Sequence, residues 1–178
     1  MKAFLHSLRC DLSRALSGIG FFAAMLAVAV IQLQAVLEEL LTPGGDVIYY
    51  LDLTLGTGYM QILMPAASTL CFSRVLQRDR ETGYMIYEKY RVTRGAYYSS
   101  KITACFVGAW GSVVGGMLLL IGILALKVPM VSEAALVNMD AYETGLFGRL
   151  LAGQKYLPYV LCMVCVRGLI AGAWSLVG

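Results

Sequence analysis

Residues 102–126 read ITACFVGAWGSVVGGMLLLIGILAL and contain no charged side chain. A helix needs about 20 consecutive apolar residues to cross roughly 30 Å of hydrocarbon, and this run is longer than that. Two more runs, 15–37 and 53–73, are also uncharged and long enough, while residues 156–178 contain a single charge, Arg167. We therefore predict an all-α integral membrane protein with about four transmembrane helices in one transmembrane domain spanning residues 1–178.

The composition favours the same class of protein. The chain is 59% hydrophobic and 14% charged, whereas soluble domains have about 45–50% apolar and about 25% charged residues. The first run, 15–37, exceeds the 7–15 apolar residues of a typical signal peptide. We predict that it remains in the membrane as the first span.

The basic residues are distributed unevenly between the segments outside these spans. Half of the fourteen Lys and Arg residues lie in residues 74–101, which we call the basic segment. The N-terminal segment 1–14 is also basic, whereas 38–52 contains no Lys or Arg and 127–155 contains three of them. Because cytoplasmic loops are enriched in Lys and Arg, we place the N-terminus and the basic segment in the cytoplasm. Segments 38–52 and 127–155 become outer loops of a protein in the plasma membrane.

Residues 1–14 show helical spacing of their apolar side chains, with Phe4, Leu8 and Leu12 separated by four residues. This pattern predicts a short amphipathic cytoplasmic helix. Such a helix either lies in the headgroup layer with its leucines toward the lipid or extends the first span into the cytoplasm.

Small residues recur at four-residue spacing in the last two spans. Gly111 and Gly115 form one such pair, and Gly168 and Gly172 form another. This spacing places both glycines of a pair on one helix face, where they allow close approach of another helix. We predict that these four glycines serve helix packing.

Two polar side chains inside the spans are candidates for a translocation pathway or another intramembrane role, Arg167 and Gln61. A charge at the bilayer centre costs about 2.5–3.5 kcal/mol on insertion scales, so its presence suggests a function. The alternative for Arg167 is a position near an interface, where its side chain reaches the headgroups.

The sequence contains no pattern typical of an enzyme. It has neither a GxxxxGK[ST] phosphate loop nor an HExxH motif, and His6 is its only histidine. Cys162 and Cys165 form a CxxC inside an apolar span, where two small packing residues are a simpler interpretation than a redox or metal site. We expect no catalytic residue, metal or cofactor on this chain. Active transport would then require an energy source on another polypeptide.

The basic segment mixes charges with tyrosines, a combination common at protein interfaces. Basic residues also anchor loops to anionic lipids at about 1 kcal/mol per charge, which is the alternative role for this segment. We favour docking of a partner protein. The candidate docking residues are Arg78, Asp79, Arg80, Glu81, Gly83, Tyr87 and Arg91.

The element Asp79-Arg80-Glu81-x-Gly83, followed by Tyr98 and Lys101 before a third span, resembles the type-2 permease subunits of ATP-binding-cassette (ABC) exporters. The resemblance covers most of residues 1–123. It implies that the basic segment contains a coupling helix bound to a separate ATP-binding-cassette ATPase subunit, which carries ATP and magnesium. It also implies pairing with a second permease subunit in a homo- or hetero-dimer. The family has six spans per subunit, whereas this sequence contains four predicted ones.

Two other functions remain compatible with the sequence. One is a non-transporting scaffold, immunity or regulatory protein whose basic loop binds a partner or anionic lipid. The other is a channel-like homo-oligomer. No feature of the sequence indicates nucleic-acid binding.

Overall fold

The computed structural model describes residues 2–40, 45–56, 60–83, 93–131 and 147–177. Within these ranges the regular structure is helical, without a strand, as the sequence predicts. The helices are α1 (Lys2–Ser17), α2 (Ile19–Leu40), α3 (Val47–Gly56), α4 (Met60–Glu81), α6 (Arg94–Ala125), α9 (Gly148–Ala152) and α10 (Tyr156–Trp174).

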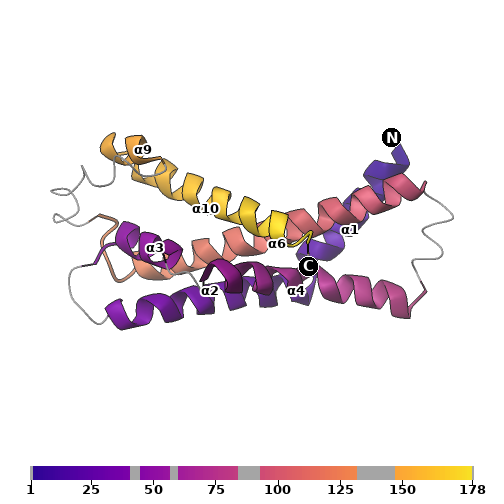
Figure 1. The fold of residues 1–178 in the computed structure, drawn as a ribbon, viewed down its shortest axis with the longest axis horizontal. Helices are drawn as coiled ribbons and strands as arrows, with labels where there is room; N and C mark the ends of the chain where they lie inside the picture. The colour runs from indigo at the N-terminus through magenta and orange to yellow at the C-terminus, as the bar shows by residue number, and fades with distance from the viewer. Residues whose placement is uncertain (1, 41–44, 57–59, 84–92, 132–146, 178) are drawn as a thin grey trace.

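Helix α6 runs along almost the whole length of the molecule (Figure 1). At about 1.5 Å per residue, its 32 residues extend for about 48 Å. Helix α1 lies along its first half and α2 along its second half, both running in the same direction as α6. Helices α4 and α10 run in the opposite direction. This alternation of direction is the one expected for consecutive membrane crossings.

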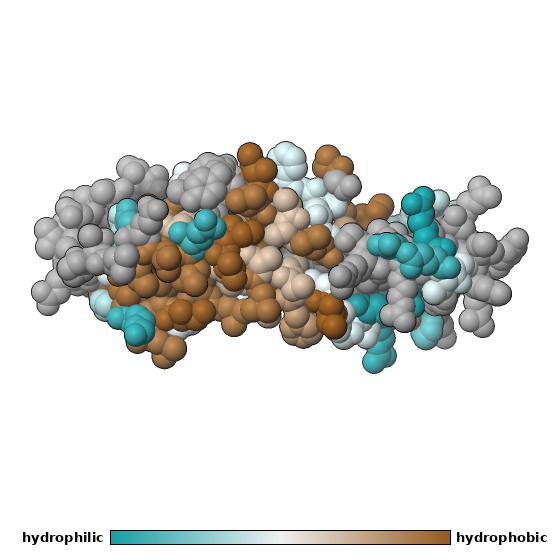
Figure 2. Space-filling model, turned by 90° about the horizontal axis from the view of Figure 1, so that it is seen from below, coloured by the Kyte–Doolittle hydropathy of each residue, from teal (hydrophilic) through white to brown (hydrophobic). Residues whose placement is uncertain are grey.

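Three of the described helices are long and apolar enough to cross a membrane, over Ile19–Leu37, Gly95–Ala125 and Tyr156–Trp174. Figure 2 shows apolar side chains over the middle of the molecule and a group of hydrophilic side chains toward the end where α4 terminates, with a few others toward the opposite end. Helix α2 keeps a stripe of large apolar side chains exposed: Ile19, Phe22, Leu26, Val30 and Leu37. A continuous exposed apolar stripe of this kind suits contact with lipid, and the protein is membrane-embedded.

The predicted span 53–73 falls on the end of α3 and the first part of α4. Pro65 lies inside α4. Helix α4 does not stop at residue 73 but continues to Glu81, so its second half carries the charges of residues 74–81, the first part of the basic segment. Because those charges dilute the apolar character of α4, this helix is not among the three apolar ones, and the fourth span stays a prediction.

The basic segment is helical at both ends rather than a loop from residue 74 to residue 101. Helix α4 includes residues 74–81, and α6 starts at Arg94. The difference has a physical reason: the loss of hydropathy marks where a helix leaves the lipid, whereas a helix ends where its backbone turns. Gly83 provides that turn after α4, with φ at +66°, a region that favours glycine.

The two other predicted loops also contain helical residues. The segment 38–52, predicted to be an outer loop, contains the end of α2 and the first part of α3, where the Asp46 carboxylate accepts a hydrogen bond from the Tyr49 N–H at 2.6 Å. The backbone N–H of Val47 donates to the carbonyl of Pro129 at 3.2 Å, which ties α3 to the segment after α6. The segment 127–155, also predicted to be an outer loop, contains the short helix α9.

The interior of the molecule differs between its two ends. The main apolar core is built from α2, α3, α4, α6, α9 and α10. Beside α1, the described apolar core consists only of Ala15 and Ala104, with Cys105 packed against them. The end that contains α1 is therefore not held together mainly by apolar packing.

Candidate functional site: a buried ion-pair network

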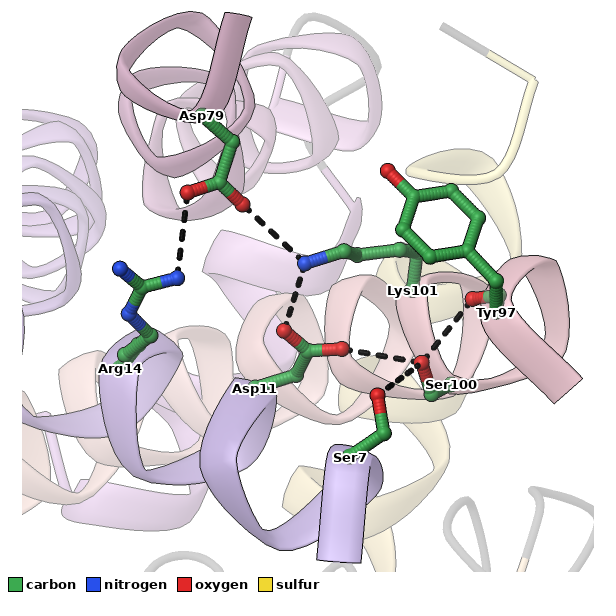
Figure 3. A network of polar contacts seen from close by, with 7 residues as sticks. All are labelled: Ser7, Asp11, Arg14, Asp79, Tyr97, Ser100 and Lys101. Atoms are coloured by element: carbon green, nitrogen blue, oxygen red, sulfur yellow. Dashed lines mark hydrogen bonds and ion pairs between the residues drawn. The ribbon is translucent and has the colours of Figure 1, made fainter. Parts of the chain in front are cut away.

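Four charged side chains from three helices meet at the end of the bundle that contains α1 (Figure 3). They are Asp11 and Arg14 of α1, Asp79 of α4 and Lys101 of α6. Two carboxylates and two cations give this group a formal net charge of zero. The balance matters because an uncompensated charge is costly to bury.

Lys101 is the centre of the network. Its Nζ lies 2.6 Å from Asp11 Oδ1 and 3.1 Å from Asp79 Oδ2, and its side chain is only 8% exposed. The ammonium also lies 5.6 Å from the centroid of the Tyr97 ring, within the range of a cation–π contact. One buried cation therefore connects a carboxylate of α1 to a carboxylate of α4.

Arg14 makes the second link between α1 and α4. Its Nη1 lies 3.1 Å from Asp79 Oδ1, so the two oxygens of Asp79 bind different cations. The Arg14 side chain is 39% exposed, and water screens this pair more than the pairs of Lys101. Arg14 closes the network toward the surface.

A serine hydroxyl binds the second oxygen of Asp11, and another serine lies next to it. Ser100 Oγ lies 2.9 Å from Asp11 Oδ2 and also 2.9 Å from the backbone carbonyl of Tyr97. Because a hydroxyl has one hydrogen, it donates to one of these acceptors at a time. Ser7 Oγ lies 3.4 Å from Ser100 Oγ, so both serines belong to the interface between α1 and α6.

The local sequence explains why α1 presents polar groups to the bundle. Ser7, Asp11 and Ala15 are four residues apart, so they form one stripe of the helix, and all three are buried. Leu5 and Leu16 are exposed instead. The spacing of the leucines alone therefore does not reveal which face of α1 is buried. The buried face carries polar groups, and side chains of α4 and α6 bind them.

Of the predicted docking residues, Asp79 does not lie at the surface. It is 2% exposed, and its carboxylate points into the chain toward Arg14 and Lys101. Arg80 and Glu81 are exposed, with Glu81 accepting a hydrogen bond from Gln77 at 2.9 Å. Arg78 lies near the end of α4, and Gly83 follows the helix by two residues. Tyr87 and Arg91 lie outside the described residues.

Sequence reasoning singled out Asp79 and Lys101 but missed Asp11, Arg14 and the two serines as their partners. Asp11 and Lys101 are 90 residues apart in the chain, so no local pattern connects them. The sequence feature that could have indicated this contact is Asp11, the one acidic residue in the N-terminal segment 1–14, with Ser7 and Ala15 one helical turn before and after it. The two adjacent tyrosines also separate in the structure, since Tyr97 is 1% exposed and Tyr98 is 55% exposed.

The four glycines lie at contacts between helices. A Cβ atom on Gly168 would come within 2.7 Å of Trp110 and Val114, and one on Gly172 would come within 2.9 Å of Phe106. These contacts join α10 to α6. On α6, a Cβ on Gly115 would meet Met25 Sδ at 2.7 Å, while one on Gly111 would reach Phe21 only at 3.4 Å, an ordinary contact distance.

Arg167 lies in the wall of a cavity between α4 and α10. The cavity holds about 230 Å³, and its wall also includes Thr54, Pro65 and Val113. Gln61 belongs to the first turn of α4, and its side chain lies outside the described part of the chain. The structure thus places Arg167 at a hollow within the apolar part of the molecule.

In the parts of the chain that the structure describes, no three His, Cys, Asp or Glu side chains are grouped as metal ligands. No protein-family model, curated protein or solved structure matches this chain.

Proposed function

We propose that this chain is the membrane-spanning permease subunit of an ATP-driven exporter. In this proposal the basic segment docks a separate ATP-binding-cassette ATPase subunit, which carries ATP and magnesium. The permease pairs with a second permease subunit in the plasma membrane, with its N-terminus in the cytoplasm. The observation that supports this role best is the ion pair between Asp79 and Lys101.

This ion pair lies at the base of the basic segment. Asp79 is near the end of α4 and Lys101 is two turns into α6, so the pair joins the two helices from which the segment extends. Asp11 and Arg14 connect the same point to α1, which leads directly into α2. A displacement of the basic segment would therefore act on three helices at once, as coupling between a docked ATPase and the membrane helices requires.

The proposal assigns different roles to neighbouring residues. Arg80 and Glu81 are exposed and suit contact with a partner, and Arg78, Gly83, Tyr87 and Arg91 belong to the same proposed surface. Asp79 is buried and suits transmission inside the chain rather than contact. Substitutions at Arg80 and Glu81 should therefore impair docking of the ATPase, whereas a substitution at Asp79 should impair coupling and leave docking intact.

The test is purification of the tagged chain from its native membranes, followed by measurement of bound ATPase activity and ATP-dependent export in vesicles. We expect the double variant Arg80→Glu/Glu81→Lys to lose the ATPase subunit. We expect Asp79→Asn to retain the subunit and its ATP hydrolysis but to lose most of the export. Asp79→Asn leaves Lys101 paired with Asp11, so the fold should survive this change.

Arg149→Glu is the matched control, because Arg149 is exposed on α9 at the other end of the molecule. It should leave binding, hydrolysis and export unchanged. If the wild-type chain retains no ATP-hydrolysing subunit, or if the variants at residues 79–81 transport normally, the exporter proposal fails. A stable chain without an ATPase would favour the scaffold or regulatory function.

A further inference from the structure

The location, the charge and the size of the cavity that contains Arg167 together point to a ligand. It lies at the depth of Val113, which is near the middle of the uncharged run 102–126. It lies between α4 and α10, and its wall includes the exposed side chains of Ile62, Ile170 and Trp174. The cavity is therefore bordered by the apolar surface that faces lipid.

The charges around the cavity favour an anion. Arg167 contributes a guanidinium to the wall, and the described lining residues include no acidic side chain. Asp52 acts on Arg167 electrostatically but is not among the residues that line the cavity. Asp52 also accepts a hydrogen bond from Tyr159 at 3.4 Å, so its charge is shared. A guanidinium offers a planar set of donors that matches carboxylate and phosphate groups.

The size of the cavity indicates how much of the ligand is enclosed. An apolar cavity of about 150 Å³ holds one benzene molecule, and pockets for drug-sized ligands occupy about 300–1,000 Å³. A cavity of about 230 Å³ holds the anionic group and a short part of the attached chain. The remainder of such a ligand would lie in the surrounding bilayer.

We propose that this cavity binds the anionic group of an amphipathic molecule that enters from the bilayer between α4 and α10. The shared chemistry is a carboxylate or phosphate on an acyl chain. Arg167 pairs with the anion, and the apolar wall formed by Ile62, Ile170 and Trp174 contacts the chain. This binding needs neither an ATPase nor transport, so it stands or fails apart from the exporter proposal.

Trp174 provides a direct readout because it lines the cavity and the chain has only two tryptophans. In a Trp110→Phe background, Trp174 fluorescence is measured in bilayers that contain brominated phosphatidylcholine, brominated phosphatidylglycerol or brominated oleate. Bromine quenches tryptophan on contact. We expect an anionic lipid to occupy the site about tenfold more strongly than phosphatidylcholine, the ratio that one charge-assisted hydrogen bond gives. The phosphatidylglycerol and oleate arms distinguish a phosphate ligand from a carboxylate ligand.

Three variants test the assignment. Arg167→Gln should abolish the preference, and it should fold because it removes a charge from the membrane interior. Arg149→Gln removes one positive charge outside the cavity and should keep the preference. Ala171→Leu retains Arg167 and fills part of the cavity, because Ala171 is buried in its wall. This variant should weaken quenching by the anionic probes.

Several results would overturn the proposal. Equal quenching by all three probes would show that the cavity does not select anions. A preference that survives Arg167→Gln, or one that Arg149→Gln also abolishes, would assign it to the general surface charge of the protein. A preference that survives Ala171→Leu but not Arg167→Gln would place the anion outside the cavity.

Discussion

Lys101 holds a position that few lysines occupy in folded proteins, since its buried ammonium bridges two buried carboxylates. Removing one partner from a buried ion pair usually costs about 3–5 kcal/mol, because it leaves an uncompensated charge. We therefore predict that Lys101→Met lowers the free energy of unfolding by about 3–5 kcal/mol. Denaturation of the purified protein in mixed micelles, followed by circular dichroism, measures this change.

A second substitution separates lost charge balance from lost packing. The double variant Asp11→Asn/Lys101→Met removes one charge of each sign and leaves the pair between Arg14 and Asp79. It should be more stable than Lys101→Met alone, which a double-mutant cycle detects as coupling between the two sites. Arg80→Met, at an exposed position, should change stability by less than about 0.5 kcal/mol. Independent, additive effects at residues 11 and 101 would contradict the network.

At the scale of the helices, α10 approaches α6 where glycine leaves space. A Cβ atom on Gly168 would lie 2.7 Å from both Trp110 and Val114, closer than normal contact. We predict that Gly168→Ala lowers stability by about 1–3 kcal/mol, because the two helices must move apart or repack. The same denaturation experiment measures it.

Gly122 provides the matched control on α6, because a Cβ atom there meets no other atom within 4 Å. Gly122→Ala should leave stability unchanged or raise it by up to about 1 kcal/mol, the difference in helix propensity between these residues. If both alanine variants behave alike, close approach at Gly168 is not what holds α10 against α6.

The elements also show how far sequence reasoning reaches. Residues 15–37, 102–126 and 156–178 predicted apolar membrane helices, and the three apolar helices of the structure overlap these ranges, although the second one begins earlier, at Gly95. Hydropathy finds such helices because it depends on composition alone. The pairing of Asp11 with Lys101 could not be predicted in this way. This pairing depends on α1 lying beside α6. Sequence patterns based on charge predict that both residues are exposed to solvent. The break between α1 and α2 at Gly18 falls inside an uncharged run, so hydropathy did not detect it.

At the scale of the whole molecule, the buried side chains along α6 change from charged to apolar. Apolar side chains fill the part between α2, α3 and α10, whereas ion pairs hold α1 against α4 and α6. Ion pairs of this kind are expensive in lipid and less costly near water. From the change between the two interiors we predict a membrane boundary just beyond Lys101, on the side of the apolar helices.

This arrangement predicts the sidedness of the two ends. From Lys101 to the end of α6 at Ala125, the helix extends about 36 Å, more than the roughly 30 Å of hydrocarbon. Cys10 on α1 and Gln154 after α9, both exposed, should therefore lie on opposite sides of the membrane. The distribution of basic residues further predicts that Cys10 faces the cytoplasm.

Labelling with a membrane-impermeant maleimide tests both parts of this prediction. A variant that retains only Cys10 should react after the cells are permeabilised and not before. A cysteine-free variant with Gln154→Cys should react in intact cells. Reaction of both positions from one side would contradict the membrane boundary derived from the two interiors. Reaction of Cys10 alone in intact cells would keep that boundary but place the basic segment outside, where a cytoplasmic ATPase cannot bind it.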